Sequence, residues 1–479
     1  MSLFGERAEK QRRRAAATAA VVIACGIGFA GGRLSMTAQY PIIKDASFRN
    51  LSFAYNEIMA NYLTGAKSKS LVDGAAQGMV ASLDDPYSVY LSGEQGEQYM
   101  ESYQDHFVGI GIEIRQQDGD FIIQDTIEGS PAAKSDLKAD DVIQAVDGKP
   151  VKGITLTELK NRIQGKAGTV VKLTVLREGT AEPQQIPVTR GEVPVITVTS
   201  EMMANRIGEI TITRFAEKTA DEFNRAIESL QKQGMKALLI DLRGNPGGLL
   251  DPTIQLANRF VPKGQVIVQV VYKDEKSVIT HKSEQQTPWK LPIAVLVDDN
   301  TASSAEVLTA ALKERAHATV VGQKTFGKGI VQNFRQLKDG SVLKLTEAQW
   351  RAPDGEWIHK KGIEPNVPVQ APAYALLPSL PVGLQLKEND YGDKVKTVQT
   401  MLQTLGYSAP STGIFDAATD AAVRAFQRDE SLPATGIVND RTAYQFSVRL
   451  LDKFKKEDPQ RNKALELLEA AETAGAAGS

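Results

Sequence analysis

Ser303 is the side chain whose position in the sequence best suits nucleophilic catalysis. It follows an apolar run predicted as a buried strand and opens a predicted helix over residues 303–313. The unpaired amides at a helix start favour negative charge, so an oxyanion formed beside Ser303 would be stabilised there. Ser303 and Glu306 also have the spacing of a capping box, which is a purely structural device. A Ser-His-Asp triad is not indicated, because the sequence has no Gly-x-Ser-x-Gly motif and no histidine in an evident partnering motif.

Lys328 is the second candidate, a lysine between two glycines and close to apolar residues. An apolar pocket lowers the pKa of a lysine, and the neutral amine can then act as a general base. In the structural interpretation, the lysine simply lies in a solvated turn. The segment 322–329 also meets the spacing of a phosphate-binding loop until its last position, where Gly329 replaces the required Ser or Thr. Nucleotide binding is therefore a weak alternative.

Taken together, these segments closely resemble those of the carboxyl-terminal processing, or tail-specific, proteases. The match covers Ser303, Lys328 at an interval of 328 − 303 = 25 residues, and the segment 328–332 (KGIVQ). The resemblance implies a Ser-Lys dyad in which Ser303 is the nucleophile, Lys328 the general base and Gln332 the residue that orients the lysine. Ser304 stands where the family usually has alanine, and its backbone N–H is expected in the oxyanion hole. The implied enzyme is a serine endopeptidase that cleaves extracytoplasmic proteins near their C-termini and needs no cofactor.

A glycine-rich turn predicts the second part of the oxyanion hole. Residues 241–250 (DLRGNPGGLL) resemble the turn that lies beside the nucleophile in the same proteases. Because glycine amides can approach a substrate carbonyl closely, we expect the N–H of Gly247 or of Gly248 to complete the oxyanion hole. The structural alternative is an ordinary glycine turn.

A module of about 85 residues begins at residue 107 (FVGIGI) and resembles a PDZ domain. In such a domain, successive amides of one loop hold a terminal carboxylate while the peptide adds as a strand. The resemblance assigns this loop to Gly109, Ile110, Gly111 and Ile112. Segments 129–133 and 137–148 extend the match. The expected ligand is the unstructured C-terminal tail of a substrate protein.

The segment from residue 392 to residue 442 resembles the three-helix peptidoglycan-binding domain that is appended to cell-wall enzymes. Its apolar positions recur at helical spacing, so a purely structural helical bundle is the alternative. Peptidoglycan is therefore an expected partner.

An uncharged, mostly apolar run covers residues 15–32 and follows three arginines. As a helix it would be about 27 Å long, enough to cross a bilayer core. The basic flank places the N-terminus in the cytoplasm and the catalytic part outside, which predicts a single-pass membrane protein. The resemblance to a peptidoglycan-binding domain implies that the membrane belongs to a bacterial cell envelope. A cleaved signal peptide and a lipoprotein modified at Cys25 are the two alternatives.

The surrounding sequence predicts the elements that must position these residues. Apolar strands alternate with helices between residues 193 and 371, which indicates an α/β core with a buried sheet. The expected strands are 207–212, 237–242, 293–297 and 319–322, and the expected helices are 220–233 and 303–313. The resemblance implies a core of the crotonase and ClpP-like kind. Further helices are expected as an amphipathic pair between residues 48 and 83, and at 131–139 and 156–164.

The predicted organisation has seven segments. They are a cytoplasmic N-terminus (1–14), a transmembrane anchor or signal (15–33), an N-terminal helical region (40–104), a PDZ domain (105–190), a protease core (191–378), a peptidoglycan-binding-like domain (379–450) and a C-terminal helix and tail (451–479). The first helical region resembles one that dimerises family members, and the C-terminal helix near residues 464–468 could assist it. A homodimer is therefore expected.

Composition excludes several classes of function. A chain of 479 residues predicts about three domains. A formal net charge of −2 gives no basic surface for nucleic acid, and a single cysteine with four histidines gives neither an internal disulfide nor a zinc spacing. No metal and no nucleic acid are expected.

Two further alternatives to a protease have less support in the sequence. A catalytically silent PDZ and wall-binding scaffold would not need the Ser-Lys-Gln set. A hydrolase of peptidoglycan itself would use a metal site, a Cys/His pair or paired carboxylates, and none of these forms a motif in the sequence.

Overall fold

The computed structural model describes residues 45–101 and 103–477. The chain divides into two compact units, residues 1–92 and 93–479. The predicted membrane segment 15–33 and Cys25 lie outside the described residues. Within the described ranges, no helix combines the length and the apolar character needed to cross a membrane.

The described part of the first unit contains the expected pair of helices. The elements are α2 (Ser47–Asn61), α3 (Ser68–Ala81) and the short strand β1 (Val89–Leu91). Neither helix buries a residue, and apolar side chains such as Phe53 (67% exposed) and Leu63 (95% exposed) remain open to solvent. Tyr90 of β1 donates a hydrogen bond to Asp73 of α3 at 3.3 Å, which links strand and helix.

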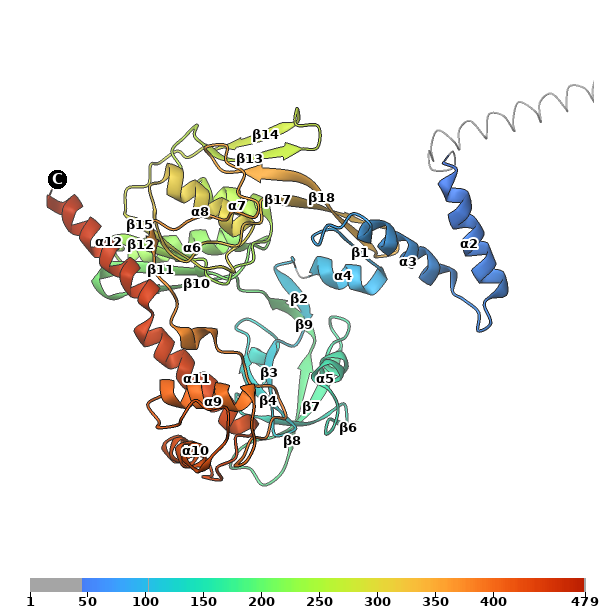
Figure 1. The fold of residues 1–479 in the computed structure, drawn as a ribbon, viewed down its shortest axis with the longest axis vertical. Coiled ribbons are helices and arrows are strands. Elements are labelled where there is room, and N and C mark those ends of the chain that lie inside the picture. The colour runs from blue at the N-terminus through green and yellow to red at the C-terminus, as the bar shows by residue number, and fades with distance from the viewer. Residues whose placement is uncertain (1–44, 102, 478–479) are drawn as a thin grey trace, which may run out of the picture. The chain divides into compact units, whose positions relative to one another are not determined.

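A largely parallel sheet forms the centre of the second unit (Figure 1). Its strands, in spatial order, are β10 (Val198–Met202), β11 (Ile207–Ile212), β12 (Ala237–Asp241), β15 (Ile293–Val297), β16 (Thr319–Gly322) and β19 (Val367–Pro368). Only the β10–β11 pair is antiparallel. The 3₁₀ turn η3 (Ala204–Arg206) joins these two strands. All four strands expected from the apolar runs are therefore present, because a parallel strand buried on both faces needs a continuous apolar sequence.

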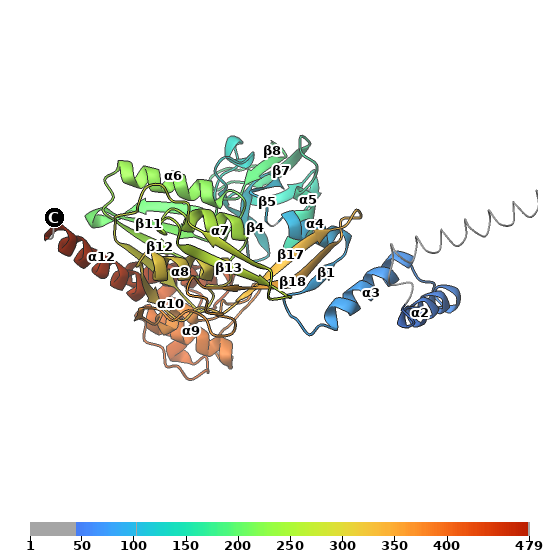
Figure 2. The ribbon, with the colours of Figure 1, turned by 90° about the horizontal axis from the view of Figure 1, so that it is seen from above.

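Helices cover both faces of this sheet. One face carries α6 (Thr219–Lys232), α7 (Leu250–Ala257) and α8 (Ser304–Arg315), which together with the sheet form the largest hydrophobic core. The opposite face carries α12 (Pro459–Ala477), and Figure 2 shows α6 and α12 on opposite sides of the strands. Ala464 and Leu468 of α12 are buried against the sheet of their own chain. These two side chains are therefore not available for the dimer contact suggested for this helix segment, and the homodimer itself stays a prediction.

A second, antiparallel sheet was not predicted from the sequence. It contains β13 (Val266–Tyr272), β14 (Val278–Lys282), β17 (Ile330–Gln336) and β18 (Val342–Arg351). The helix α4 (Gly93–Glu101) packs beside β17 and β18, where Tyr99 meets Phe334 edge to face with ring centroids 5.6 Å apart. Strand β17 carries Gln332.

The PDZ-like module is built on a separate six-stranded antiparallel sheet with its own core. Its elements are β3 (Ile112–Gln117), β4 (Asp120–Thr126), η2 (Ala132–Lys134), β5 (Val142–Val146), β6 (Lys149–Pro150), α5 (Leu156–Ile163), β7 (Val170–Leu176) and β8 (Gln184–Thr189). The ribbon of β2 (His106–Gly109) and β9 (Gly191–Pro194) joins it to the α/β core. The expected helix at 131–139 is only the short turn η2, because Ser135 is extended and its hydroxyl binds the N–H of Leu137 at 3.2 Å.

Three helices form the C-terminal bundle, as predicted. After the turn η4 (Ala373–Leu376) come α9 (Asp393–Thr404), α10 (Ala417–Asp429) and α11 (Asp440–Glu457). Phe415, Phe426 and Phe446 fill the core of this bundle. Two buried glutamines hold the turns that precede α10 and α11: Gln399 accepts from the N–H of Gly413 at 2.8 Å, and Gln427 accepts from that of Gly436 at 3.0 Å. The chain then returns to the parallel sheet through α12.

Candidate active site

One cavity of the second unit brings together the residues that the sequence singled out for catalysis. It has a volume of about 780 Å³. Its lining includes Gly247, Gly248, Ser303, Ser304, Lys328 and Gln332. These residues come from three segments, which the parallel sheet and the second sheet place at one site. The remaining lining is largely apolar or aromatic and includes Tyr99, Phe334 and Trp350.

Ser303 is held in an unusual backbone conformation at the N-cap of α8. Its φ is 56° and its ψ is −119°, a region that residues other than glycine rarely adopt. The preceding N–H of Ala302 donates to the carbonyl of Asn245 at 2.9 Å, and the N–H of Ser303 donates to Glu306 Oε2 at 2.8 Å. Such strain persists only where neighbouring contacts enforce it, and it is typical of functional sites.

Glu306 joins the serine segment to the lysine segment. This side chain is fully buried, and its Oε2 accepts from the N–H groups of both Ser303 and Lys328 at 2.8 Å. Its Oε1 accepts from the N–H of Gly327 at 2.7 Å and from the Thr325 hydroxyl at 2.6 Å. Burial raises the pKa of Glu306, while these four hydrogen bonds oppose the shift. The sequence indicated only the first of these contacts, the capping-box bond, because the others come from residues 19 to 22 positions away.

The backbone of Lys328 is fixed from several sides. Its carbonyl accepts a hydrogen bond from the indole of Trp350 at 2.9 Å. The next residue, Gly329, accepts from the indole of Trp357 at 2.7 Å and donates to His359 Nδ1 at 3.3 Å. The lysine therefore does not lie in a free solvated turn. Neither tryptophan carried a motif that would have identified it from the sequence.

Gln332 lines the same cavity from β17. Its side-chain nitrogen donates to Thr346 Oγ1 on the neighbouring strand β18 at 3.3 Å. This contact turns the amide nitrogen toward the sheet. The carbonyl oxygen of the side chain is then the group available to accept from a cation.

The turn of residues 243–248, here named the glycine loop, lies directly against Ser303. Gly247 has φ 95°, and a Cβ atom built on it would come within 2.8 Å of the Cβ of Ser303. Its N–H donates to the side chain of Asn245 at 2.8 Å and is already used. Among the described residues, the N–H groups of Gly248 and Ser304 have no hydrogen-bond acceptor. Of the two glycines that the sequence left open, the geometry thus favours Gly248.

The hydroxyl of Ser304 has a structural partner. It donates to the carbonyl of Gly248 at 2.8 Å. This bond couples the start of α8 to the glycine loop. The departure from the usual alanine therefore adds a contact and leaves the backbone N–H unchanged.

The PDZ loop lies away from this cavity. Gly109, Ile110 and Gly111 are buried, Ile112 is partly buried, and none of the four lines the cavity that contains Ser303. The carbonyl of Ile110 accepts from the N–H of Ala132 at 2.7 Å, so the loop is tied to the turn η2. The structure does not bring this predicted binding loop together with the predicted dyad.

Comparison with known families assigns the parts of the chain. Residues 206–369 match peptidase family S41, residues 108–188 a PDZ domain and residues 391–445 a peptidoglycan binding domain. Residues 33–95 match a model described as the activating protease CtpB N-terminal domain. Over 424 residues the chain is 43% identical to the carboxy-terminal processing protease CtpA of Bacillus subtilis (strain 168), covering 88% of this chain and 91% of that relative. The chain is a carboxy-terminal processing protease of peptidase family S41.

A further relative agrees with this assignment. A protein of Staphylococcus aureus (strain bovine RF122 / ET3-1), described as "Probable CtpA-like serine protease", is 36% identical over 425 residues, with 88% of this chain and 85% of the relative covered. Among solved structures, a photosystem II D1 C-terminal processing protease is 28% identical, covers 63% of this chain and 82% of its own, and has a TM-score of 0.40. The family, the hydrolase activity and the three named domains expected from the sequence are confirmed.

Proposed function

We propose that this S41 protease cleaves peptide bonds with a Ser-Lys dyad formed by Ser303 and Lys328. The observation that carries the proposal is the common cavity that both residues line, with the buried Glu306 carboxylate bound to the N–H of each. Because one rigid group holds both backbones, serine and lysine have a fixed relative position, which nucleophilic catalysis requires. The nucleotide-dependent enzyme, the wall hydrolase and the silent scaffold have no comparable support.

In the proposed reaction, the neutral amine of Lys328 takes the proton of Ser303 Oγ while Oγ attacks the scissile carbonyl carbon. The oxyanion formed is stabilised by the N–H groups of Gly248 and Ser304. On collapse, the C–N bond breaks and the leaving amine takes the proton from the Lys328 ammonium, which leaves an ester on Ser303. Water then attacks this ester with Lys328 again as base, the acid product leaves, and Ser303 regains its proton.

Gln332 orients the lysine in this proposal. Its amide nitrogen is occupied by Thr346, so its carbonyl oxygen would accept from the Lys328 ammonium. An acceptor at this place would stabilise the charged form of the lysine after it has taken the serine proton.

The proposed substrates are unstructured C-terminal tails of extracytoplasmic proteins, recognised by the PDZ domain. The confirmed PDZ domain supports this proposal, with the loop 109–112 as the carboxylate site. A peptide with a free C-terminus should be cleaved faster than the same peptide with an amidated C-terminus. Equal rates for the two peptides would argue against recognition of the terminal carboxylate.

The proposed location is the bacterial cell envelope, with residues 15–33 as the membrane segment. The peptidoglycan-binding domain supports an envelope location, and peptidoglycan is the proposed partner of the C-terminal bundle. The proposed assembly is a homodimer, which the exposed apolar residues of α2 and α3 support.

The dyad is tested by proteolysis with the full-length purified chain. An unfolded protein with a small apolar C-terminus is incubated with wild type, Ser303→Ala and Lys328→Ala in the presence of a metal chelator, and mass spectrometry scores the products. Cleavage should occur with wild type and be absent from both variants. Lys324→Ala is the matched control, because Lys324 lies on the same loop but is exposed and paired with Glu364 at 2.7 Å. Cleavage by Lys328→Ala at the rate of Lys324→Ala would exclude the dyad.

A further inference from the structure

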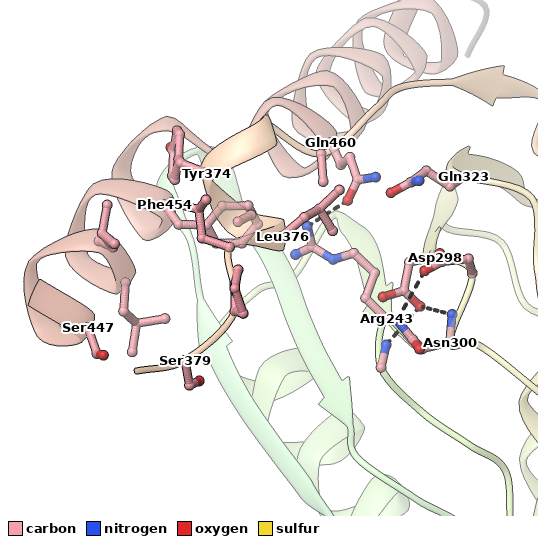
Figure 3. Close-up of a pocket in the computed structure, with 18 of the residues that line it drawn as sticks. Arg243, Asp298, Asn300, Gln323, Tyr374, Leu376, Ser379, Ser447, Phe454 and Gln460 are labelled. Atoms are coloured by element: carbon pink, nitrogen blue, oxygen red, sulfur yellow. Dashed lines mark hydrogen bonds between the residues drawn. The ribbon is translucent and has the colours of Figure 1, made fainter. Parts of the chain in front are cut away.

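The charge of Arg243, the first residue of the glycine loop, is balanced partly from the C-terminal segment. Its guanidinium lies 2.6 Å from Asp241 of β12 and 2.7 Å from Asp458, which stands between α11 and α12. It also donates to Gln460 Oε1 at 3.0 Å, and the ring of Phe454 lies 5.8 Å from it. Figure 3 shows Arg243 and Gln460 in contact, and both line a cavity of about 560 Å³.

Asp458 is buried, and its two carboxylate oxygens have separate tasks. Its side chain is only 3% exposed. The oxygen Oδ1 accepts from the N–H groups of Gln460 and Arg461 at 3.1 and 3.0 Å and thereby caps α12. The oxygen Oδ2 contacts Arg243. Burial acts against the charge of Arg243, but the two carboxylates outweigh it and raise its pKa, so this buried cation depends on its anionic partners.

A short chain of contacts leads from Arg243 to the predicted oxyanion hole. The backbone N–H of Arg243 donates to Asp241 at 2.9 Å, and the N–H of Gly244 donates to Asp298 at 2.9 Å. Asn245 then accepts from Ala302, the residue before the nucleophile, and also holds the N–H of Gly247. The position of the Gly248 N–H thus depends on a loop whose first side chain is fixed by the C-terminal segment.

We infer that Asp458 is a positioning residue for catalysis, which acts through Arg243 to hold the glycine loop in the shape that faces Ser303. This inference rests on the proposed function of Ser303 and Gly248. According to this inference, residues 458–460 contribute to proteolytic activity. In the sequence, the peptidoglycan-binding domain (391–445) then stands between two segments of the protease core, which are residues 206–369 and helix α12.

The sharpest variant is Asp458→Asn in the full-length chain. Asparagine is as good an N-cap as aspartate, so α12 keeps its cap. Arg243, however, no longer has the negatively charged partner that Asp458 provides. With a fluorogenic peptide that has a free C-terminus, kcat should fall about tenfold or more, because small misplacements of catalytic groups are costly, while KM should change less than about twofold. Hydrogen exchange of residues 243–249 should become faster than in wild type.

The matched control is Glu472→Gln. It removes another ion pair between α12 and the core, the contact of Glu472 with Lys236 at 2.6 Å, which lies away from the glycine loop. This variant should keep wild-type kcat and wild-type exchange of residues 243–249. In addition, Asp458→Asn should cause no further loss of kcat in an Arg243→Met background, since that background already lacks the cation that Asp458 contacts.

The outcomes separate this inference from the proposed dyad. A kcat of Asp458→Asn within twofold of Glu472→Gln, or a change confined to KM, would overturn the positioning role. If peptide cleavage persists in Ser303→Ala, the dyad fails, and the exchange rates alone then decide the inference. Exchange of residues 243–249 equal to wild type in Asp458→Asn would overturn it in that case too.

Discussion

At the scale of single residues, Glu306 decides how the site is built. A serine at φ 56° needs contacts that enforce this conformation, and the Glu306 carboxylate supplies one of them through the Ser303 N–H. The same carboxylate accepts from the N–H of Lys328. A carboxylate can accept all four of these hydrogen bonds. An amide side chain could not, because its NH₂ group would face N–H or O–H donors.

Glu306→Gln should therefore impair catalysis strongly. Either orientation of the amide leaves an NH₂ group facing backbone N–H groups, so we expect about a tenfold or larger loss of kcat and a loss of roughly 1–3 kcal/mol in stability. Steady-state kinetics and thermal unfolding measure both effects. Glu314→Gln, the same chemical change on the same helix but outside the cavity, is the control. Equal kcat values for the two variants would contradict the role of Glu306.

Ser304→Ala should have a small effect on catalysis. The change removes the hydroxyl that donates to Gly248, which costs about 1 kcal/mol of stability, and it keeps the backbone N–H. We expect kcat within about twofold of wild type by peptide cleavage. A loss as large as that of Ser303→Ala would mean that the Ser304 hydroxyl takes part in the chemistry.

At the scale of elements, α8 is the helix on which the site depends. Its residues 304–312 are all buried, so it has no polar face and its sequence shows little helical periodicity. The helix reaches partly solvent-accessible positions only in its last turn, where Glu314 accepts from the N–H of Asp354 at 2.9 Å. Burial, followed by repulsion from Asp354, raises the pKa of Glu314 to about 6.

This raised pKa predicts a pH dependence of stability. A carboxyl group whose pKa is higher in the folded state than in the unfolded state stabilises the fold below the unfolded pKa, and this contribution is lost as pH rises through about 6. Glu314→Gln should therefore be more stable than wild type at pH 8, by about 1–2 kcal/mol, and equal to it near pH 4. Thermal unfolding at the two pH values measures the difference. A constant difference across this range would exclude Glu314 as its source.

At the scale of the whole molecule, the last helix completes the protease core. Helix α12 covers the sheet face opposite α6, α7 and α8, and its Ala464 and Leu468 pack on residues of β11, β12, β15 and β16. Without α12, this apolar face of the sheet would be exposed to water. The C-terminal segment therefore belongs to the core structurally, although the peptidoglycan-binding domain separates the two in sequence.

Leu468→Ala should lower the stability of the protease core. The side chain is 2% exposed, and truncating a buried leucine costs about 2–4 kcal/mol. The loss of proteolytic activity on heating should shift to a lower temperature. Leu451→Ala on α11 is the control, since that leucine is 53% exposed and should change little. Equal shifts would mean that α12 contributes nothing specific to the core.

Local patterns in the sequence were sufficient for the motifs and for the buried parallel strands. Ser303, Lys328, Gln332 and the glycine pair stand in short segments that resemble those of the carboxyl-terminal processing proteases, and this resemblance singled them out. The strands of the central sheet are continuous apolar runs, because both of their faces are covered. Each of these features is encoded within a few neighbouring residues.

Only the tertiary structure decided which atoms those residues present to one another. The choice between Gly247 and Gly248 depends on the Asn245 side chain, and the several tasks of Glu306 depend on a loop 19 to 22 residues away. Asp458 contacts Arg243 although the two residues are 458 − 243 = 215 positions apart in the sequence. No periodic pattern in the sequence predicts this contact. Contacts between distant segments are set by how complementary surfaces pack, and a single sequence carries no local signal for such packing.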